Sequence, residues 1–213
     1  MRLATAIVVT LVVTLVVTAP GPAIAQAPTK PPNGLATEGL SGEPVALLPV
    51  TLAVIDPALR GDTALTLLGD RRHLLLWADS IVSDALQGHA PEVNWIPARR
   101  LRQMARRNPG MIPDPDQMGQ SILRAPKLSK VPDPLRGSLR SLTAISGGRY
   151  AMVPAALGLT RAPDGGVRAD LSLVLADARS GLVVWRSATF GSGSAPSDAL
   201  TAAVVAILPA TGR

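Results

Sequence analysis

The sequence predicts an α/β (α+β) domain in which helices pack on a mixed sheet that ends in an antiparallel meander. Three observations support this fold class. The almost continuously apolar run Val45–Ile55 is typical of a buried strand. The stretch Arg71–Gln87 repeats apolar residues at steps of three and four, as one face of a helix does. The last third alternates apolar and polar residues between glycine-containing turns, which is typical of antiparallel strands.

The chain opens with a segment typical of a secretory signal peptide. Arg2 supplies a positive charge, an uncharged run extends over residues 3–18, and the small-residue site Ala-Ile-Ala follows at residues 23–25. Cleavage after Ala25 would make Gln26 the first residue of a periplasmic or secreted protein. A retained membrane anchor is the alternative, but the apolar run is shorter than the roughly 20 residues that span a bilayer. We therefore expect no transmembrane span after cleavage.

The absence of cysteine limits what an exported chain can be. Without it there is no lipobox, so no lipid anchor, and no disulfide framework. We expect a flexible Pro/Gly-rich tether over residues 26–44, a single α/β domain over residues 45–209 and a short tail over residues 210–213. The five aromatic residues are too few to fill a core, which must consist mostly of Leu, Val, Ile and Ala.

The first half of the domain is expected to start with a strand and a long helix. Pro49 complicates the strand Val45–Ile55, because proline cannot donate a hydrogen bond to a neighbouring strand. Asp70 is placed to cap the helix Arg71–Gln87, and Gly88 to end it.

The middle of the chain is expected to be less regular. A short strand over Val93–Ile96 precedes a basic amphipathic helix over Ala98–Arg107. Six prolines interrupt residues 108–134, where we predict only a short helix over Asp116–Leu123. Asp133 is expected to cap a further helix, with Pro134 in its first turn.

The meander of the final third is predicted to contain three strands. They are Arg149–Leu159, Val167–Ala176 and Leu182–Phe190, with a hairpin turn at Asp164-Gly165-Gly166 between the first two. We expect a flexible link over Gly191–Ser194 and a last helix over Ser197–Leu208.

A strong positive charge is confined to one segment. The chain has 21 basic and 15 acidic residues, yet the segment from Ala98 to Arg140 alone contains ten basic and three acidic ones. In an exported protein such a segment favours an envelope protein, an anionic polymer or a lipid surface as partner. Nucleic acid is excluded because no aromatic residue lies among the basic ones. A solvated arginine-rich surface is the alternative. The candidate residues for binding an anionic partner are Arg99, Arg100, Arg102, Arg106 and Arg107, predicted to lie on an exposed helix face.

No catalytic, cofactor-binding or metal-binding constellation is recognised. His73 and His89 are the only histidines, 16 residues apart, which does not suit a zinc site. Asp114 and Asp116 lack the glycine-centred loop of a calcium site. The glycine-serine stretch at residues 191–194 lacks the remaining residues of a phosphate-binding loop. We therefore predict no cofactor and expect neither histidine to be essential.

The last third also shows a family resemblance. A strand at Arg149–Ala156, the turn Ala178-Arg179-Ser180-Gly181 and the following Leu182–Arg186 with its Trp185 resemble exported α/β domains. That group comprises the TolB amino-terminal domain, the outer-membrane activators of peptidoglycan synthases and the curli secretion channel. The opening Val-Ala-Leu-Leu-Pro-Val is similar to its first strand. The resemblance implies a non-enzymatic envelope protein that binds a partner.

The sequence thus favours a non-enzymatic periplasmic or secreted protein that binds a protein or envelope partner. The alternatives are a hydrolase with a diffuse site and a basic module for membrane or cell-wall surfaces. A carboxylate of perturbed pKa in a deep pocket would favour the hydrolase. The sequence leaves the oligomeric state and the partner open.

Overall fold

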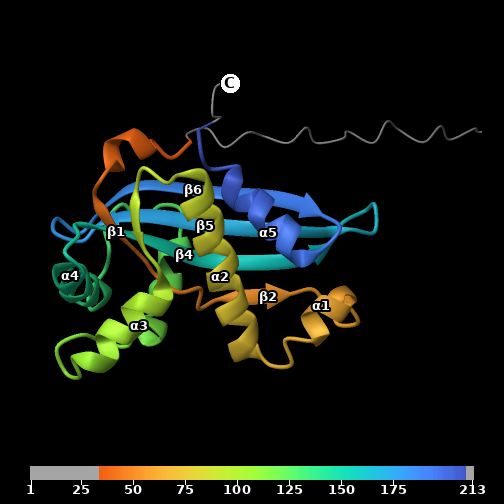
Figure 1. Cartoon of the computed structure of the whole chain (residues 1–213), viewed down its shortest axis with the longest axis horizontal. Helices are drawn as coiled ribbons and strands as arrows, with labels where there is room; N and C mark the ends of the chain where they lie inside the picture. Colours follow the sequence, from red (N-terminus) through yellow and green to blue (C-terminus); the bar gives the residue numbers. More distant parts are fainter. Residues whose placement is uncertain (1–33, 210–213) are drawn as a thin grey trace, which may run out of the picture.

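The computed structural model describes residues 34–209 of the 213-residue chain. The predicted signal peptide, the first part of the tether and the predicted tail lie outside the described residues. Within them the predicted fold class is confirmed, since helices pack on a six-stranded mixed sheet (Figure 1). No helix in this part of the chain has the length and apolar character needed to cross a membrane.

The sheet has the strand order β3-β1-β4-β5-β6, and β2 pairs with β4 further along the edge that β1 also uses. β1 runs parallel to β3 and β4, and β2 runs parallel to β4, whereas β4, β5 and β6 form the predicted antiparallel meander. The strands are β1 (Pro44–Leu47), β2 (Ala53–Ile55), β3 (Asn94–Ile96), β4 (Tyr150–Arg161), β5 (Val167–Asp177) and β6 (Leu182–Gly193).

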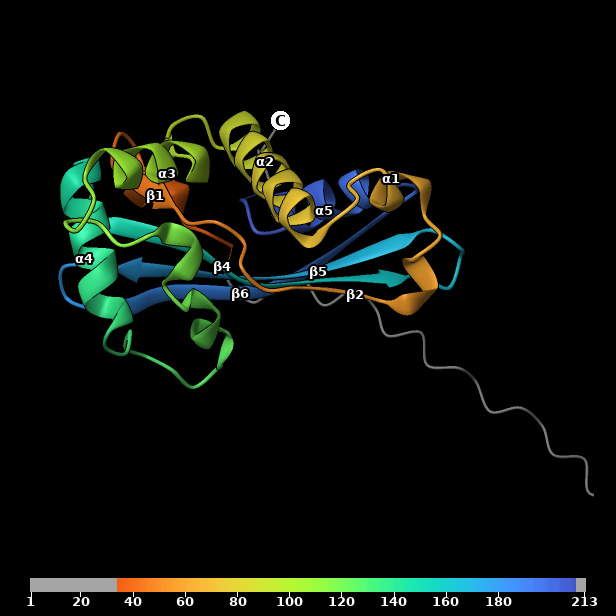
Figure 2. The same cartoon turned by 90° about the horizontal axis from the view of Figure 1, so that it is seen from below.

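Helices cover both faces of the sheet (Figure 2). The helices are α1 (Thr63–Thr66), α2 (Arg71–His89), α3 (Ala98–Arg107), α4 (Leu135–Ser146) and α5 (Pro196–Val205). Alternation along β5 builds two cores, because successive side chains of a strand point to opposite faces. Leu171, Leu173 and Leu175 pack with α2 and α5, whereas Val174 and Ala176 pack with α3 and α4.

The predicted first strand is two strands in the structure. β1 ends at Leu47 and β2 begins at Ala53, with Pro49 in the gap. The chain is still held along β4, because Leu48 N–H donates to Met152 O and Leu157 N–H donates to Leu52 O, both at 2.9 Å. The break leaves the N–H of Val50 free to bond outside the sheet.

The long helix is close to its prediction. The Asp70 cap is confirmed, since its carboxylate accepts the N–H of His73 at 2.9 Å. The predicted end is wrong, because α2 runs through Gly88 to His89 and stops at Ala90. His89 is therefore the last residue of the helix rather than a loop residue.

Two predictions for the proline-rich middle are wrong. The helix expected over Asp116–Leu123 is replaced by two 3-10 turns, η3 (Pro115–Gln117) and η4 (Gln120–Arg124), separated by Gly119 in the left-handed region. Asp133 does not cap α4. Its carboxylate instead pairs with Arg136 at 3.2 Å, and Pro134 occupies the cap position without a side-chain hydrogen bond.

The predicted flexible link near the C-terminus belongs to a strand. β6 continues to Gly193, and α5 packs directly on it from Pro196 to Val205, a shorter range than predicted. A Cβ at Gly191 would lie 2.3 Å from both Ala199 O and Ala203 N, so the missing side chain allows this close approach.

The packed domain begins earlier than predicted. Leu35 and Leu40 are buried in the core beneath α2 and α5, and the 3-10 turn η1 (Thr37–Leu40) lies between strand and terminus. Leu35 N–H also donates to Ile207 O at 2.7 Å, which ties this segment to the end of α5. Residues 34–44 are thus part of the domain and not of a tether.

Candidate functional site

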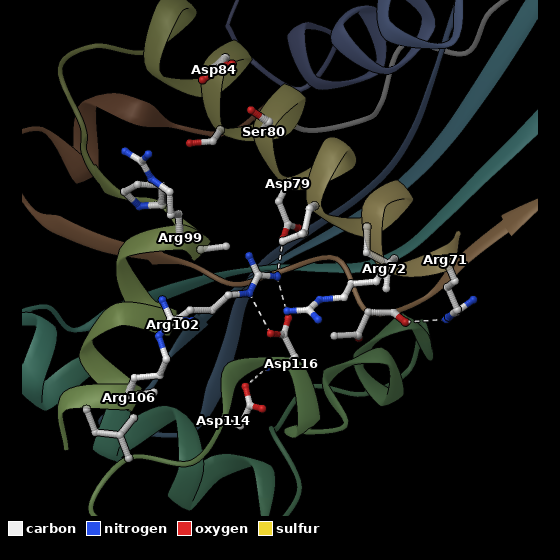
Figure 3. Close-up of a pocket in the computed structure, with 18 of the residues that line it drawn as sticks. Arg71, Arg72, Asp79, Ser80, Asp84, Arg99, Arg102, Arg106, Asp114 and Asp116 are labelled. Carbon is white, nitrogen blue, oxygen red and sulfur yellow. Dashed lines mark hydrogen bonds and ion pairs between the residues drawn. The ribbon is translucent and has the colours of Figure 1, made fainter. Parts of the chain in front are cut away.

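A cleft of about 1380 Å³ lies between α2 and α3 (Figure 3). One wall is the side of α2 that carries Asp79, from Arg71 to Gln87. The other wall is α3, and Ile112, Asp114 and Asp116 from the following segment line the cleft as well. The cleft therefore combines elements that are separated in the sequence by β3.

Helical spacing determines which arginines of α3 face the cleft. Leu101 is fully buried against the second core and fixes the rotation of the helix. Arg99, Arg102 and Arg106, at steps of three and four residues, all line the cleft. Arg100 is not part of the lining, and neither is Arg107, so the five candidate arginines do not form one surface.

Arg102 is the buried centre of the site. Its Nε and Nη2 donate to the two oxygens of Asp116 at 2.8 and 2.6 Å, and Nη2 also donates to Asp79 Oδ2 at 2.6 Å. Only 12% of the Arg102 side chain is exposed. The prediction that Arg102 is exposed is therefore wrong, because two acidic partners draw it into the protein.

Asp79 connects this centre to the broken strand. Its Oδ1 accepts the N–H of Val50 at 2.6 Å, the group that the gap between β1 and β2 leaves free. Burial raises the pKa of Asp79 to about 6, although the Val50 N–H and Arg102 favour the ionised form. Burial alone would lower the pKa of Arg102, but hydrogen bonds to Asp116 and Asp79 hold it above its ordinary value. The ion pairs of Arg102 with Asp79 and Asp116 hold α2, α3 and η3 together.

The remaining arginines of the candidate set are free of acidic partners. Arg99, Arg100, Arg106 and Arg107 are exposed and form no ion pair within residues 34–209. On the α2 wall, Arg72 is also exposed and forms no ion pair within residues 34–209.

Among the cleft residues that the sequence analysis missed are Asp79 and Arg72. Asp79 could have been found from its position, because it is an acidic residue among the apolar positions of α2. A carboxylate buried at such a position requires a partner. Arg72 carries no comparable signal, because an exposed charged side chain needs no partner.

The residues considered for catalysis or metal binding lie apart from one another. His73 pairs with Asp70 at 3.1 Å at the start of α2, and His89 Nδ1 lies 3.0 Å from Ala85 O at its end. Asp114 accepts the N–H of Asp116 at 3.0 Å. Across the described residues no group of three or more His, Cys, Asp or Glu side chains is arranged to hold a metal ion.

No protein-family model and no curated protein matches the chain. Solved structures of similar shape do exist. A PelC dodecamer from Paraburkholderia phytofirmans is 16% identical with a TM-score of 0.38, covering 86% of this chain and 98% of that one. The LpoB C-terminal domain from Salmonella enterica is 12% identical with a TM-score of 0.37, covering 73% and 84%. Lipoprotein GNA1162 from Neisseria meningitidis is 15% identical with a TM-score of 0.33, covering 72% and 82%.

The presence of LpoB, a peptidoglycan synthase activator, among these structures agrees with the resemblance found in the sequence. Identities of 12 to 16% and TM-scores below 0.5 mark a distant similarity of shape, which assigns no function to this chain.

Proposed function

We propose that the protein is an exported, non-enzymatic binding protein of the cell envelope, and that the α2–α3 cleft and the arginines around it hold an anionic partner. The main support is that the arginines of α3 differ in whether they have acidic partners. Arg102 has two acidic partners, whereas Arg99, Arg100, Arg106 and Arg107 have none in the described part of the chain.

Uncompensated guanidinium groups on one short helix repel each other, and an anion relieves that repulsion. Arginine also suits this role because its planar donors bind carboxylates and phosphates in pairs. A cluster of such groups beside a cleft therefore supports binding of an anionic component, with an affinity that falls as salt rises.

The test is charge reversal with a matched control. Arg99→Glu/Arg106→Glu should weaken binding to anionic material by about tenfold at low salt, because two favourable contacts become repulsive. Arg60→Glu/Arg179→Glu alters the net charge equally at exposed positions outside the cleft and should leave binding unchanged.

Three binding arms separate the sources of the anion: vesicles containing phosphatidylglycerol, isolated wall polymer and acidic peptide. Arg102 is left intact in every variant, because its ion pairs with Asp79 and Asp116 hold the fold together. If both double variants bind all three materials like the wild type, the arginines are a solvated surface and the proposal fails.

A hydrolase is the second candidate, favoured by one observation: Asp79 lines the cleft and its pKa is raised to about 6. However, both carboxylate oxygens of Asp79 are engaged, one by Val50 and the other by Arg102. An acid held in this way is placed to stabilise the fold rather than to transfer a proton. Turnover of ester or glycoside substrates that Asp79→Asn abolishes, in a variant that remains folded, would favour the hydrolase instead.

A further inference from the structure

We propose that the occupant of the α2–α3 cleft is an acidic amphipathic helix of a partner protein. This inference rests on the proposed function and narrows it from any anionic component to one kind of partner. Three properties of the cleft carry it: its length, its apolar positions and the presence of both arginines and aspartates on its walls.

The dimensions suit a helix. The cleft volume of about 1380 Å³ exceeds the roughly 300–1,000 Å³ of ordinary small-molecule pockets. The α2 wall runs from Arg71 to Gln87, which corresponds to roughly 24 Å of helix at 1.5 Å per residue. A helix of about 16 residues has the same length. Two helical walls also present the ridges and grooves against which a third helix packs.

The walls offer apolar contacts that a purely polar polymer would not use. Exposed Leu76 and partly buried Leu75 lie on the α2 wall, and partly buried Ala105 lines the cleft from the α3 side. Leu76 is 40% exposed, although it is a large apolar side chain on an otherwise well-packed helix. An apolar stripe on the partner would remove this surface from water.

The charges favour discrete acidic residues over a uniform polyanion. Arg72 on one wall and Arg99 and Arg106 on the other are free to pair with carboxylates on both flanks of a bound helix. Asp84 and Asp114 also line the cleft and would repel a lipid surface or a phosphate polymer, whose negative charge repeats at every unit. A helix can place its acidic residues opposite the arginines and leave neutral residues opposite Asp84 and Asp114.

The probe is a fluorescein-labelled peptide of about 16 residues, the length of the cleft, with leucines on one helical face and glutamates on both flanks. It is compared with a scrambled peptide of identical composition, using the full chain without its signal segment. We expect the ordered peptide to bind about tenfold more tightly, since only it presents both features at once. Arg99→Glu/Arg106→Glu should remove this advantage, Leu76→Ser should reduce it, and Arg60→Glu/Arg179→Glu should preserve it.

A second measurement locates the bound peptide. The chain contains no cysteine, so Ser80→Cys in the cleft and Ser192→Cys at the end of β6 each accept a single environment-sensitive dye. The ordered peptide should change the signal at position 80 and leave that at position 192 unchanged.

Each alternative result has a defined meaning. Equal binding of ordered and scrambled peptides, or an unchanged dye signal at position 80, overturns the helix inference. Binding of vesicles or wall polymer that depends on Arg99 and Arg106, without binding of the ordered peptide, overturns it too but leaves the proposed function standing. If no anionic material binds through these arginines, both proposals fail.

Discussion

At the scale of single residues, the five arginines of α3 show how position decides the role of a side chain. They lie within nine consecutive residues and have the same chemistry. Arg102 alone reaches Asp79 and Asp116, because the rotation of α3 fixed by Leu101 points it into the protein. The others remain available to a partner.

We expect Arg102→Ala to lower the free energy of unfolding by about 3 kcal/mol, because it leaves the buried acid Asp79 without its cation. Arg106→Ala, one turn further along the same helix, should change it by less than about 0.5 kcal/mol. Urea denaturation of both variants at neutral pH measures the difference. Equal stability of the two variants would show that the ion pairs of Arg102 contribute nothing to the stability of the fold.

Asp177 makes a second ion pair whose effect on stability depends on pH. Hydrogen bonds from Arg149 hold the pKa of Asp177 well below its ordinary range, and Asp177 Oδ1 accepts the N–H groups of Arg179 and Ser180. A carboxyl whose pKa is lower in the folded than in the unfolded chain stabilises the fold above about pH 4, and this contribution is lost as the pH falls.

We therefore expect Asp177→Asn, which keeps the turn-forming oxygen but loses the charge, to cost about 2 kcal/mol at pH 7. The difference from the wild type should shrink steadily below about pH 4, because there the carboxyl takes up a proton in the unfolded chain while it stays ionised in the folded one. Unfolding free energies measured from pH 7 to pH 2 test this. A difference that stays constant over that range would assign the loss to packing instead of charge.

At the scale of elements, breaks in regular structure position the site. The gap between β1 and β2 frees the N–H of Val50 for Asp79, and the 3-10 turn η3 brings Asp116 to Arg102. α2 contributes to both the core and the cleft. Leu74 and Ala78 pack into the core, whereas Arg72 and Leu76 line the cleft.

The contact between α5 and β6 gives a prediction at this scale. Gly191→Ala should destabilise the protein by about 3 kcal/mol, because the new Cβ would collide with the α5 backbone at Ala199 and Ala203. The matched control is Gly137→Ala in α4, where nothing lies within 4 Å of the new Cβ. This change should raise stability by about 0.5–1 kcal/mol through the helix propensity of alanine. Thermal unfolding compares them, and the same shift in both would contradict the steric argument.

At the scale of the whole molecule, the segment from Ala98 to Arg140 concentrates positive charge on the side of the sheet that carries α3 and α4. Part of this charge is neutralised by the Arg102 and Arg136 ion pairs. Of the remaining basic residues of this segment, Arg99 and Arg106 line the cleft. They would meet an anionic partner only if the protein reaches the envelope.

Export itself is the prediction at this scale. The mature chain should begin at Gln26, because Ala23 and Ala25 provide the small side chains that a signal peptidase requires. Intact-mass measurement of protein isolated from the expressing cells decides this. A mature species that still contains Arg2 would contradict cleavage and favour a retained anchor.

Local patterns in the sequence were sufficient for much of the fold. Helical spacing placed α2 and α3, and alternation placed the inward residues of β5, because these periodicities follow from backbone geometry alone. The same patterns misjudged Gly88 and Gly191. A glycine ends a helix or breaks a strand only when its surroundings favour that outcome, and here α2 and β6 continue through it.

The sequence by itself determined the fold class, the long helices and the concentration of arginine in α3. Only the tertiary structure decided which arginines are free, because Asp79 and Asp116 lie 23 and 14 residues from Arg102 along the chain. The cleft, too, exists only once α2 and α3 pack side by side on the broken strand. Charge and periodicity are local properties of a sequence, whereas the neutralisation of a charge depends on partners that folding brings together.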